Sequence, residues 1–229
     1  MIEPTSFRQF RDHPESAFYC ADGLAPEGTW AAVYDALRHT IAGVFMDKRS
    51  EAIAISTEAL IGWHRNIFGA VFPDDAGRIR SRDAVGAWEH VGFGINVGTA
   101  LTRRTRPVGG AHPARIVSQL SRAIEAARAQ IEQIETGEDT NSLSEAALVI
   151  ATVYAKALRI HPFIDGNLRA SYVLMQACLL RLDLPGVVFD QSHDAHDEAL
   201  GFALRVDSQQ SYQPFAALLE SLIRDADTK

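Results

Sequence analysis

The sequence predicts an all-α domain, a bundle of about eight helices with one small β-hairpin. Apolar residues recur at helical spacing through most of the 229 residues. Alternation of the kind that favours strands is confined to residues 83–110, where Phe93, Ile95 and Val97 alternate with small residues. An apolar content of 47% and a charged content of 22% are ordinary for a globular chain, so we expect one well-buried domain.

The N-terminal part is predicted to hold an arm and two helices. Residues 1–28 carry mixed charge, prolines and glycines, and we expect them to be extended or partly ordered. Thr29 is the predicted N-cap of a helix that ends near Phe45. The second helix covers about residues 56–68 and includes His64, which we expect to be a packed or capping residue.

The C-terminal part is predicted to be helical after the hairpin. Pro113 suits the first turn of a long helix that ends near Ile134. Residues 142–145 form a capping box before the next helix, whose apolar side chains cover much of its circumference. That helix and the mostly apolar helix over residues 170–182 should therefore pack at the centre. A last helix covers about residues 212–225.

Residues 192–198, Ser-His-Asp-Ala-His-Asp-Glu, contain several potential metal ligands. His193 or Asp194 could approach Asp197 or Glu198 from consecutive turns of a helix. A stable site needs three or four convergent ligands, and acids in a first turn are stabilised by the helix dipole. We therefore predict an acid-rich helix start here in preference to a metal site.

Composition also excludes some classes of partner. A net charge of −7 argues against nucleic acid, because neutralising phosphates requires a basic face. No apolar run is long enough to cross a membrane and the N-terminus lacks a signal-peptide pattern, so no membrane partner is expected. Cys178 lies in an apolar helix, where a buried reduced thiol suits the predicted cytoplasmic location.

The nine residues from His161 to Arg169 join the two most apolar predicted helices. The second helix should begin near Gly166 or Asn167, where unpaired N–H groups and the helix dipole favour anions, and Gly166 allows a ligand to approach closely. Arg169 suits phosphate oxygens, and Asp165 is an oxygen ligand of the kind Mg²⁺ takes beside phosphates. His161 can accept a proton near pH 7. Each residue alone is ordinary turn chemistry, but together they indicate attack of a hydroxyl on phosphorus.

The same segment resembles the signature of the Fic domain, His-Pro-Phe-x-Asp-Gly-Asn-x-Arg, within the wider Fic/Doc superfamily. The residues in register are His161, Pro162, Phe163, Asp165, Gly166, Asn167 and Arg169. The resemblance implies that His161 deprotonates a target hydroxyl, with Asn167 and Arg169 as further catalytic residues. It also implies that Asp165 binds Mg²⁺ and that Phe163 is a core anchor. The nucleotide phosphates would be held by Gly166, Asn167, Leu168 and Arg169.

The resemblance extends from about residue 53 to 223 and implies a domain division. Residues 1–50 would be the N-terminal arm and first helix, and residues 51–229 a Fic-like catalytic domain with a flap at about 88–104. Such a flap holds the target segment by strand addition. Arg80 falls on the arginine of an Ala-Gly-x-x-Arg segment that leads toward it. The arginines at 103, 104 and 106 suit either the steering of an acidic target or nucleotide, or a solvated surface.

Two positions depart from the adenylylating members of the family. Those members usually have glycine where Leu168 stands and a second arginine where Tyr172 stands. That arginine is associated with the terminal phosphate of ATP and with an inhibitory glutamate. The one spacing match to the inhibitory segment, Ser121 to Glu125, lies outside the family's usual place. The resemblance therefore implies that any inhibition comes from a separate antitoxin-like chain.

The predicted activity is that of a protein nucleotidyltransferase, or AMPylating enzyme. It would move a nucleoside monophosphate from Mg²⁺-bound ATP, or another nucleoside triphosphate, to a Ser, Thr or Tyr hydroxyl of a protein docked on the flap. The alternatives are a phosphotransferase toxin like the Doc branch, and a catalytically inactive Fic-fold binding module. The intact His161, Asp165, Asn167 and Arg169 argue against the binding module.

Overall fold

The computed structural model describes residues 29–48, 53–80, 92–97, 104–137, 142–188 and 194–227. Helices dominate this part of the chain, as the sequence predicts, and most predicted helix ends agree with the observed ones within about one turn. Pro113–Arg115 form a short 3-10 helix, η2, and the α-helices are α2 (Thr29–Lys48), α3 (Thr57–Phe68), α5 (Ile116–Thr136), α6 (Ser142–Ile160), α7 (Asn167–Arg181), α8 (Asp194–Val206) and α9 (Gln209–Asp227).

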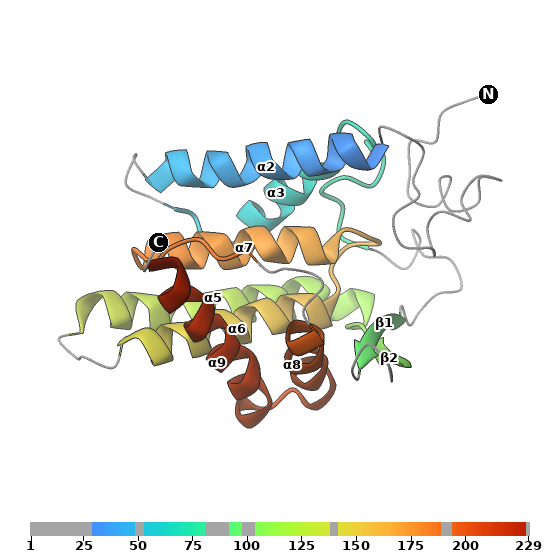
Figure 1. Cartoon of the computed structure of the whole chain (residues 1–229). Helices are drawn as coiled ribbons and strands as arrows, with labels where there is room; N and C mark the ends of the chain where they lie inside the picture. The colour runs from blue at the N-terminus through green and yellow to red at the C-terminus, as the bar shows by residue number, and fades with distance from the viewer. Residues whose placement is uncertain are drawn as a thin grey trace.

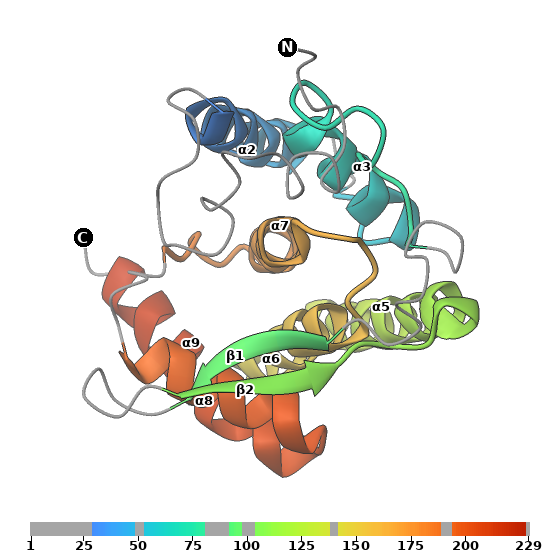
Figure 2. The same ribbon diagram turned by 90° about the vertical axis from the view of Figure 1, so that its right-hand side faces the viewer.

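Helices α6 and α7 form the centre of the molecule, as their apolar sequences predict. Figure 2 shows α7 end-on, with α2 and α3 on one side and α6 on the other. Of the 15 residues of α7, all but four are buried, because helices α2, α3 and α6 pack around it. Helix α6 packs in turn against α5, α8 and α9 (Figure 1). The loop between α6 and α7 is therefore held between two well-packed helices.

The last helix begins earlier than predicted, at Gln209 in place of about residue 212. Ser208 and Ser211 exchange hydrogen bonds between backbone N–H and side-chain oxygen, at 3.0 and 3.2 Å. This reciprocal arrangement caps the first turn in the manner of a capping box, with serine in place of the usual Glu or Gln. The Ser-x-x-Ser pattern was present in the sequence but is a weak signal by itself.

A two-stranded antiparallel hairpin lies between α3 and α5. Strand β1 (Gly92–Val97) pairs with β2 (Arg104–Gly109), with Gly92 opposite Gly109 and Val97 opposite Arg104. The predicted hairpin is confirmed, but the flap predicted at about 88–104 ends where β2 begins. Strand β2 lies within the predicted β region 83–110 but outside the predicted flap, because its sequence, Arg-Thr-Arg-Pro-Val-Gly, carries charge and proline, which weaken a strand signal.

The hairpin packs against α8 through β1. In both views β1 lies on the side of α7 and β2 on the side away from it (Figures 1 and 2). Among the described residues, none of the helices has both the length and the apolar composition that a bilayer crossing requires.

Two other predictions concern the start of α8 and the cysteine of α7. His196 is 8% exposed, lies 3.3 Å from the Asp197 carboxylate and meets the edge of Phe215, so it faces the core. The side chains of His193 and Asp194 lie outside the described residues, and the described part contains no cluster of three potential metal ligands. Cys178 is buried and is not in a disulfide, as predicted for a reduced thiol.

Candidate active site at the start of α7

The loop between α6 and α7 adopts a conformation that brings its ends together. His161, directly after α6, has a positive φ of 54°, and Gly166, directly before α7, has a φ of 75°. Between them Phe163 is 1% exposed and inserts into the core, as predicted for an anchor residue. The anchored loop therefore returns toward its own beginning, so that residues of the first turn of α7 lie beside His161.

Asn167 is the residue that fixes the imidazole of His161. The Phe163 N–H donates to Asn167 Oδ1 at 2.9 Å, and Asn167 Nδ2 donates to the Phe163 carbonyl at 3.0 Å. Because these bonds orient the amide, the Nδ2 group is the one that lies 3.1 Å from His161 Nε2. A donor in that place requires Nε2 to be an acceptor, and hence the ring hydrogen to be on Nδ1.

The surroundings of His161 keep its imidazole neutral. Burial and, to a smaller extent, the nearby charge of Arg80 lower its pKa from 6.5 to about 4. A hydrogen bond with the Leu158 carbonyl acts in the opposite direction. At pH 7 the ring therefore has an unprotonated Nε2, which is the state that a general base needs.

Arg80 connects the loop to both ends of the hairpin segment. Its side chain is 1% exposed, and its Nε donates to the His161 carbonyl at 2.5 Å. Its Nη2 donates to the carbonyls of Ala111 and Ile160. The backbone N–H of Arg80 donates to the Pro162 carbonyl at 2.9 Å, and that of Ala111 to the Ile160 carbonyl at 3.0 Å. The chain before β1 and the chain after β2 are thus both bonded to the residues that flank His161.

His64 on α3 supports the same loop from the core side. Its ring is 0% exposed and stacks on Phe163, with centroids 3.8 Å apart and an interplanar angle of 17°. The Gly77 N–H donates to Nδ1 at 2.9 Å, so the hydrogen lies on Nε2, which donates to the Asp165 carbonyl at 3.0 Å. Burial lowers the pKa of His64 to about 4. The prediction that His64 is a packed residue is confirmed, and its position makes it a support of the loop.

Gly166 is required here for a different reason from the one that the sequence suggested. The sequence predicted a close approach of a ligand to the backbone at this glycine. In the structure a Cβ on Gly166 would lie 2.2 Å from Phe68 Cε2 and 3.0 Å from His64 Nε2. Its φ of 75° would also strain any other residue. The close approach is therefore to the core, and it seats the N-terminus of α7 against α3.

The first turn of α7 exposes backbone donors and one cation. Within the described residues no side chain caps the helix, whereas Ser56 caps α3 by accepting from the Ala59 N–H at 3.1 Å. Leu168 is 45% exposed, so its side chain points to solvent and its backbone stays in the first turn. The guanidinium of Arg169 stacks on the Tyr34 ring of α2, 5.3 Å from its centroid. Uncapped N–H groups beside a guanidinium are suited to an anion such as phosphate.

Asp165 is the one carboxylate of the motif. Its Oδ1 accepts from the Gly166 N–H at 2.5 Å, which holds the carboxylate beside the helix start. Mg²⁺ is commonly bound by one or two carboxylates together with substrate phosphates and water. A single oriented carboxylate next to an anion-binding turn fits that donor set, and a cage of several protein ligands is not needed.

Tyr172, at the position where a second arginine was expected in related proteins, has a structural contact. Its hydroxyl donates to the Val187 carbonyl at 2.7 Å, and Gln176 Nε2 donates to the same oxygen at 2.5 Å. Both side chains of α7 thereby hold the segment that follows the helix. The side chain at position 172 therefore has a structural role, and Arg169 is the cation of the motif.

Comparison with known proteins identifies the fold family. The model of the Fic/DOC family matches residues 54–179, more than half of the chain. The chain belongs to the Fic/DOC family. The Fic match begins just before α3 and ends within α7, so it contains the loop, the hairpin and the residues that support them. Membership supports a Fic-type transferase activity in general terms. No curated protein matches the sequence.

Solved Fic structures share the architecture of this chain. A Fic domain containing signaling protein from Bacteroides thetaiotaomicron has a TM-score of 0.62 and 17% identity, over 93% of this chain and 75% of that one. Fic-1 of C. elegans (residues 134–508) has a TM-score of 0.56 and 20% identity, over 93% of this chain and 56% of that one. BepC of Bartonella tribocorum, solved with bound AMPPNP, has a TM-score of 0.52 and 20% identity, over 83% and 85% of the two chains. At these identities the shared property is the fold.

The structure brings several of the predicted Fic site residues together. His161 and Asn167 are in contact, and Asp165 and Gly166 are joined by a hydrogen bond at the helix start. Leu168 and Arg169 occupy the first turn of α7. Sequence analysis missed Tyr34, because an aromatic residue on a distant helix gives no sign that it will meet Arg169. The supporting role of His64 had one signal, its place on the apolar face of α3 with Leu60, Ile67 and Phe68.

Proposed function

We propose that this Fic protein transfers a nucleoside monophosphate from a nucleoside triphosphate to a hydroxyl of a target protein. The phosphates would lie on the uncapped first turn of α7, against the N–H groups of Asn167, Leu168 and Arg169 and the Arg169 guanidinium. The target hydroxyl would replace the Asn167 amide as the hydrogen-bond donor to His161 Nε2, whose single lone pair accepts one bond. Its oxygen attacks the α-phosphorus, its proton moves to Nε2, and pyrophosphate leaves.

The observation that carries the proposal is the orientation of His161. An imidazole whose Nε2 is unprotonated, and which is held by Asn167 beside a helix N-terminus, is a base next to an anion site. Its low pKa would rise when phosphate charges bind nearby, because negative charge favours the imidazolium. The same ring would therefore be neutral before binding and a stronger base in the complex. The AMPPNP bound to BepC, which shares the fold, supports a nucleotide as the anion.

Asp165 would hold the Mg²⁺ that accompanies the nucleotide. The ion would supply neutralisation of phosphate charge, while Asp165 itself is kept in place by Gly166 and, through its carbonyl, by His64. The hairpin would present the target segment along the outer edge of β1, on the side of α7. An antitoxin-like chain that inhibits transfer is part of the same proposal.

Intact-mass spectrometry of the purified protein tests this function. The protein is incubated with Mg²⁺ and each nucleoside triphosphate in turn, alone and with a cell lysate as the source of target. A gain of one nucleoside monophosphate, on the protein or on a target, is expected. The variant His161→Ala should abolish transfer and retain nucleotide binding by calorimetry. His39→Ala, an exposed histidine of α2, is the matched control and should retain both.

Other outcomes would replace the proposal. Gain of a single phosphate, with ADP as product, would select the Doc-like phosphotransferase. No mass change with any nucleotide, with or without lysate, would select the binding module. Transfer that persists in His161→Ala would show that another group takes the proton.

A further inference from the structure

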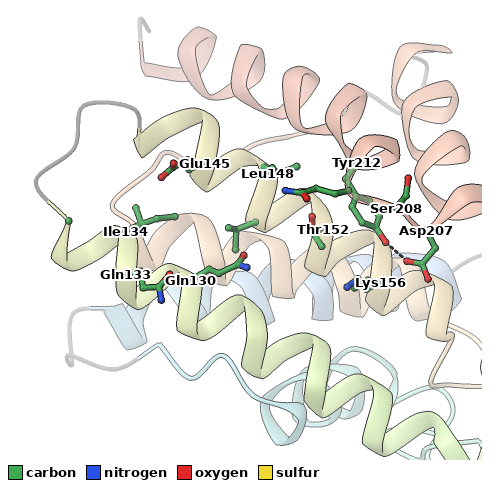
Figure 3. Close-up of a pocket in the computed structure, with 13 residues that line it drawn as sticks. Gln130, Gln133, Ile134, Glu145, Leu148, Thr152, Lys156, Asp207, Ser208 and Tyr212 are labelled. Carbon is green, nitrogen blue, oxygen red and sulfur yellow. Dashed lines mark hydrogen bonds between the residues drawn. The ribbon is translucent and has the colours of Figure 1, made fainter.

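A groove separate from the α7 helix start runs between α5 and α6. One hollow of about 670 Å³ lies between these helices and the start of α9, and a second of about 620 Å³ lies at the end of the hairpin. Lys156 and Asp207 line both hollows, so the hollows are neighbours, and together they are here called the α5–α6 groove. Figure 3 shows side chains of the first hollow from α5 (Gln130 and Gln133), from α6 (Thr152 and Lys156), and from α9 and the residues just before it (Tyr212 and Asp207).

The charges at the hairpin end of the groove favour acidic residues of an occupant. Asp207 pairs with Arg159, whose Nε lies 3.6 Å from its Oδ2, and it also accepts from the Tyr212 hydroxyl. Lys156 and Arg122 also line the groove, and in the described part of the chain neither has an ion pair. The hollow at the hairpin end therefore carries two uncompensated positive charges on a protein whose net charge is −7. The first hollow has no such excess, because Glu145 and Asp207 line it together with Lys156. A local excess of cations on an acidic protein attracts carboxylates selectively.

The other side chains of the groove suit a polypeptide backbone. Gln130, Gln133 and Gln209 carry amides, which can donate and accept at once, as can the hydroxyls of Thr152 and Ser208. An extended chain offers alternating N–H and C=O groups that require such partners. The lining of the hairpin end includes two glycines and three alanines, which leave space for side chains of the occupant.

The hairpin end of the groove is lined by residues that are bonded to the segment beside His161. Gly109, the last residue of β2, and Ala111 line its hairpin end, as does Ile160, the residue before His161. Ala111 and Ile160 are joined by the hydrogen bond that ties the hairpin to the motif. A polypeptide that enters the groove at this end therefore passes beside the residues that position His161.

We propose that the α5–α6 groove binds an extended segment of the target protein, whose acidic residues lie in the hollow at the hairpin end, at a distance along the chain from the hydroxyl that is modified. This rests on the proposed function for the identity of the partner, but the binding itself requires no chemistry. The target would be held at two places, the hairpin edge and the groove. Selection of a target would then depend on its acidic segment as well as on the residues around the hydroxyl.

Fluorescence anisotropy with defined peptides tests the groove directly. The probe is a labelled peptide of about twelve residues, with Glu and Asp in one half and Ser, Gly and Gln in the other, so that the acidic half can lie at the hairpin end of the groove. The same peptide with Lys in place of the acids is the control. We expect the acidic peptide to bind, more weakly at higher salt because exposed charges are screened. Lys156→Glu and Arg122→Glu should each weaken binding by about tenfold and together by more.

Arg38→Glu, on the exposed surface of α2, is the matched control for charge reversal and should leave peptide binding unchanged. A benzoylphenylalanine at Gln130 should crosslink to the acidic peptide, and the same group at Arg38 should not. Failure of the acidic peptide to bind above the Lys peptide, or equal binding by Lys156→Glu and the wild type, would overturn the proposal. His161→Ala should keep full peptide binding, so failure of transfer and failure of the groove are separate results.

Discussion

The buried imidazole of His64 provides the sharpest test of how the candidate site is supported. Two substitutions each keep one of its two hydrogen bonds and remove the other. His64→Asn keeps an acceptor near the Nδ1 position for the Gly77 N–H, and His64→Gln keeps a donor near the Nε2 position for the Asp165 carbonyl. Neither amide titrates, so both variants also remove the proton-binding group.

The size of the effect follows from the two contacts and the pKa. Leaving one buried backbone group without a partner costs about 1–3 kcal/mol of stability at pH 7. The imidazole has a second effect, because burial lowers its pKa from 6.5 to about 4. The unfolded chain therefore binds the proton first as pH falls, and stability that is complete above about pH 6.5 is lost as the pH falls through 4. That loss amounts to about 3 kcal/mol for His64.

Urea unfolding at a series of pH values between about 4 and 7.5 measures the stability at pH 7 and the loss of stability on acidification. We expect each variant to be less stable than the wild type at pH 7, but to lose about 3 kcal/mol less on acidification. The exposed His39→Asn variant is the control for removal of a histidine. A pH dependence in His64→Asn and His64→Gln that equals that of the wild type would refute the argument that this ring is buried and neutral in the folded protein.

Three further predictions concern the loop. Gly166→Ala should destabilise the protein by about 2 kcal/mol or more in urea unfolding, because the added Cβ would meet Phe68 and the backbone is in a left-handed conformation. The control is Gly62→Ala, in an open position of α3, which should stabilise the protein by up to about 1 kcal/mol. Asn167→Asp places a carboxylate where His161 Nε2 has a donor, so the pKa of His161 should rise above about 4 in an NMR titration and transfer should fall at least about tenfold. Arg80→Met removes a cation that lowers the pKa of His161, and it removes the side-chain bonds to the carbonyls of His161 and Ala111. The pKa of His161 should therefore rise, proteolysis of residues 81–110 should become faster, and nucleotide binding should be retained.

Most of the fold could be predicted from local pattern. Helices α2, α3, α5, α6 and α7 carry apolar side chains at helical spacing. The start of α3 is marked by the N-cap Ser56, and the start of α7 by Gly166. Glycine-separated apolar residues gave strand β1. Strand β2 and the start of α9 were placed incompletely, because β2 has little apolar alternation and the Ser208–Ser211 cap is recognised only when both bonds are seen.

The chemistry of the motif was also determined by the sequence. Its residue types, a base, a carboxylate, an amide and a guanidinium, follow one another within a single loop and helix start, so their proximity is guaranteed by the chain itself. Phe163 and His64 were predicted to pack, and they do, because an apolar or uncharged ring on the inner face of a helix or loop is favourably buried in the core.

The tertiary structure alone decided what holds these residues in place. Arg80 and His64 reach the loop from far along the chain, and their partners are backbone carbonyls and N–H groups. Every residue has a backbone carbonyl, so the residue types in the sequence give no sign of which ones these side chains will meet. The same holds for Arg169 on Tyr34, and for the α5–α6 groove, whose lining comes from segments distant in sequence. The order of residues within the motif specifies which chemical groups the site contains. Long-range packing decides how each is oriented, because orientation depends on atoms that the sequence places elsewhere.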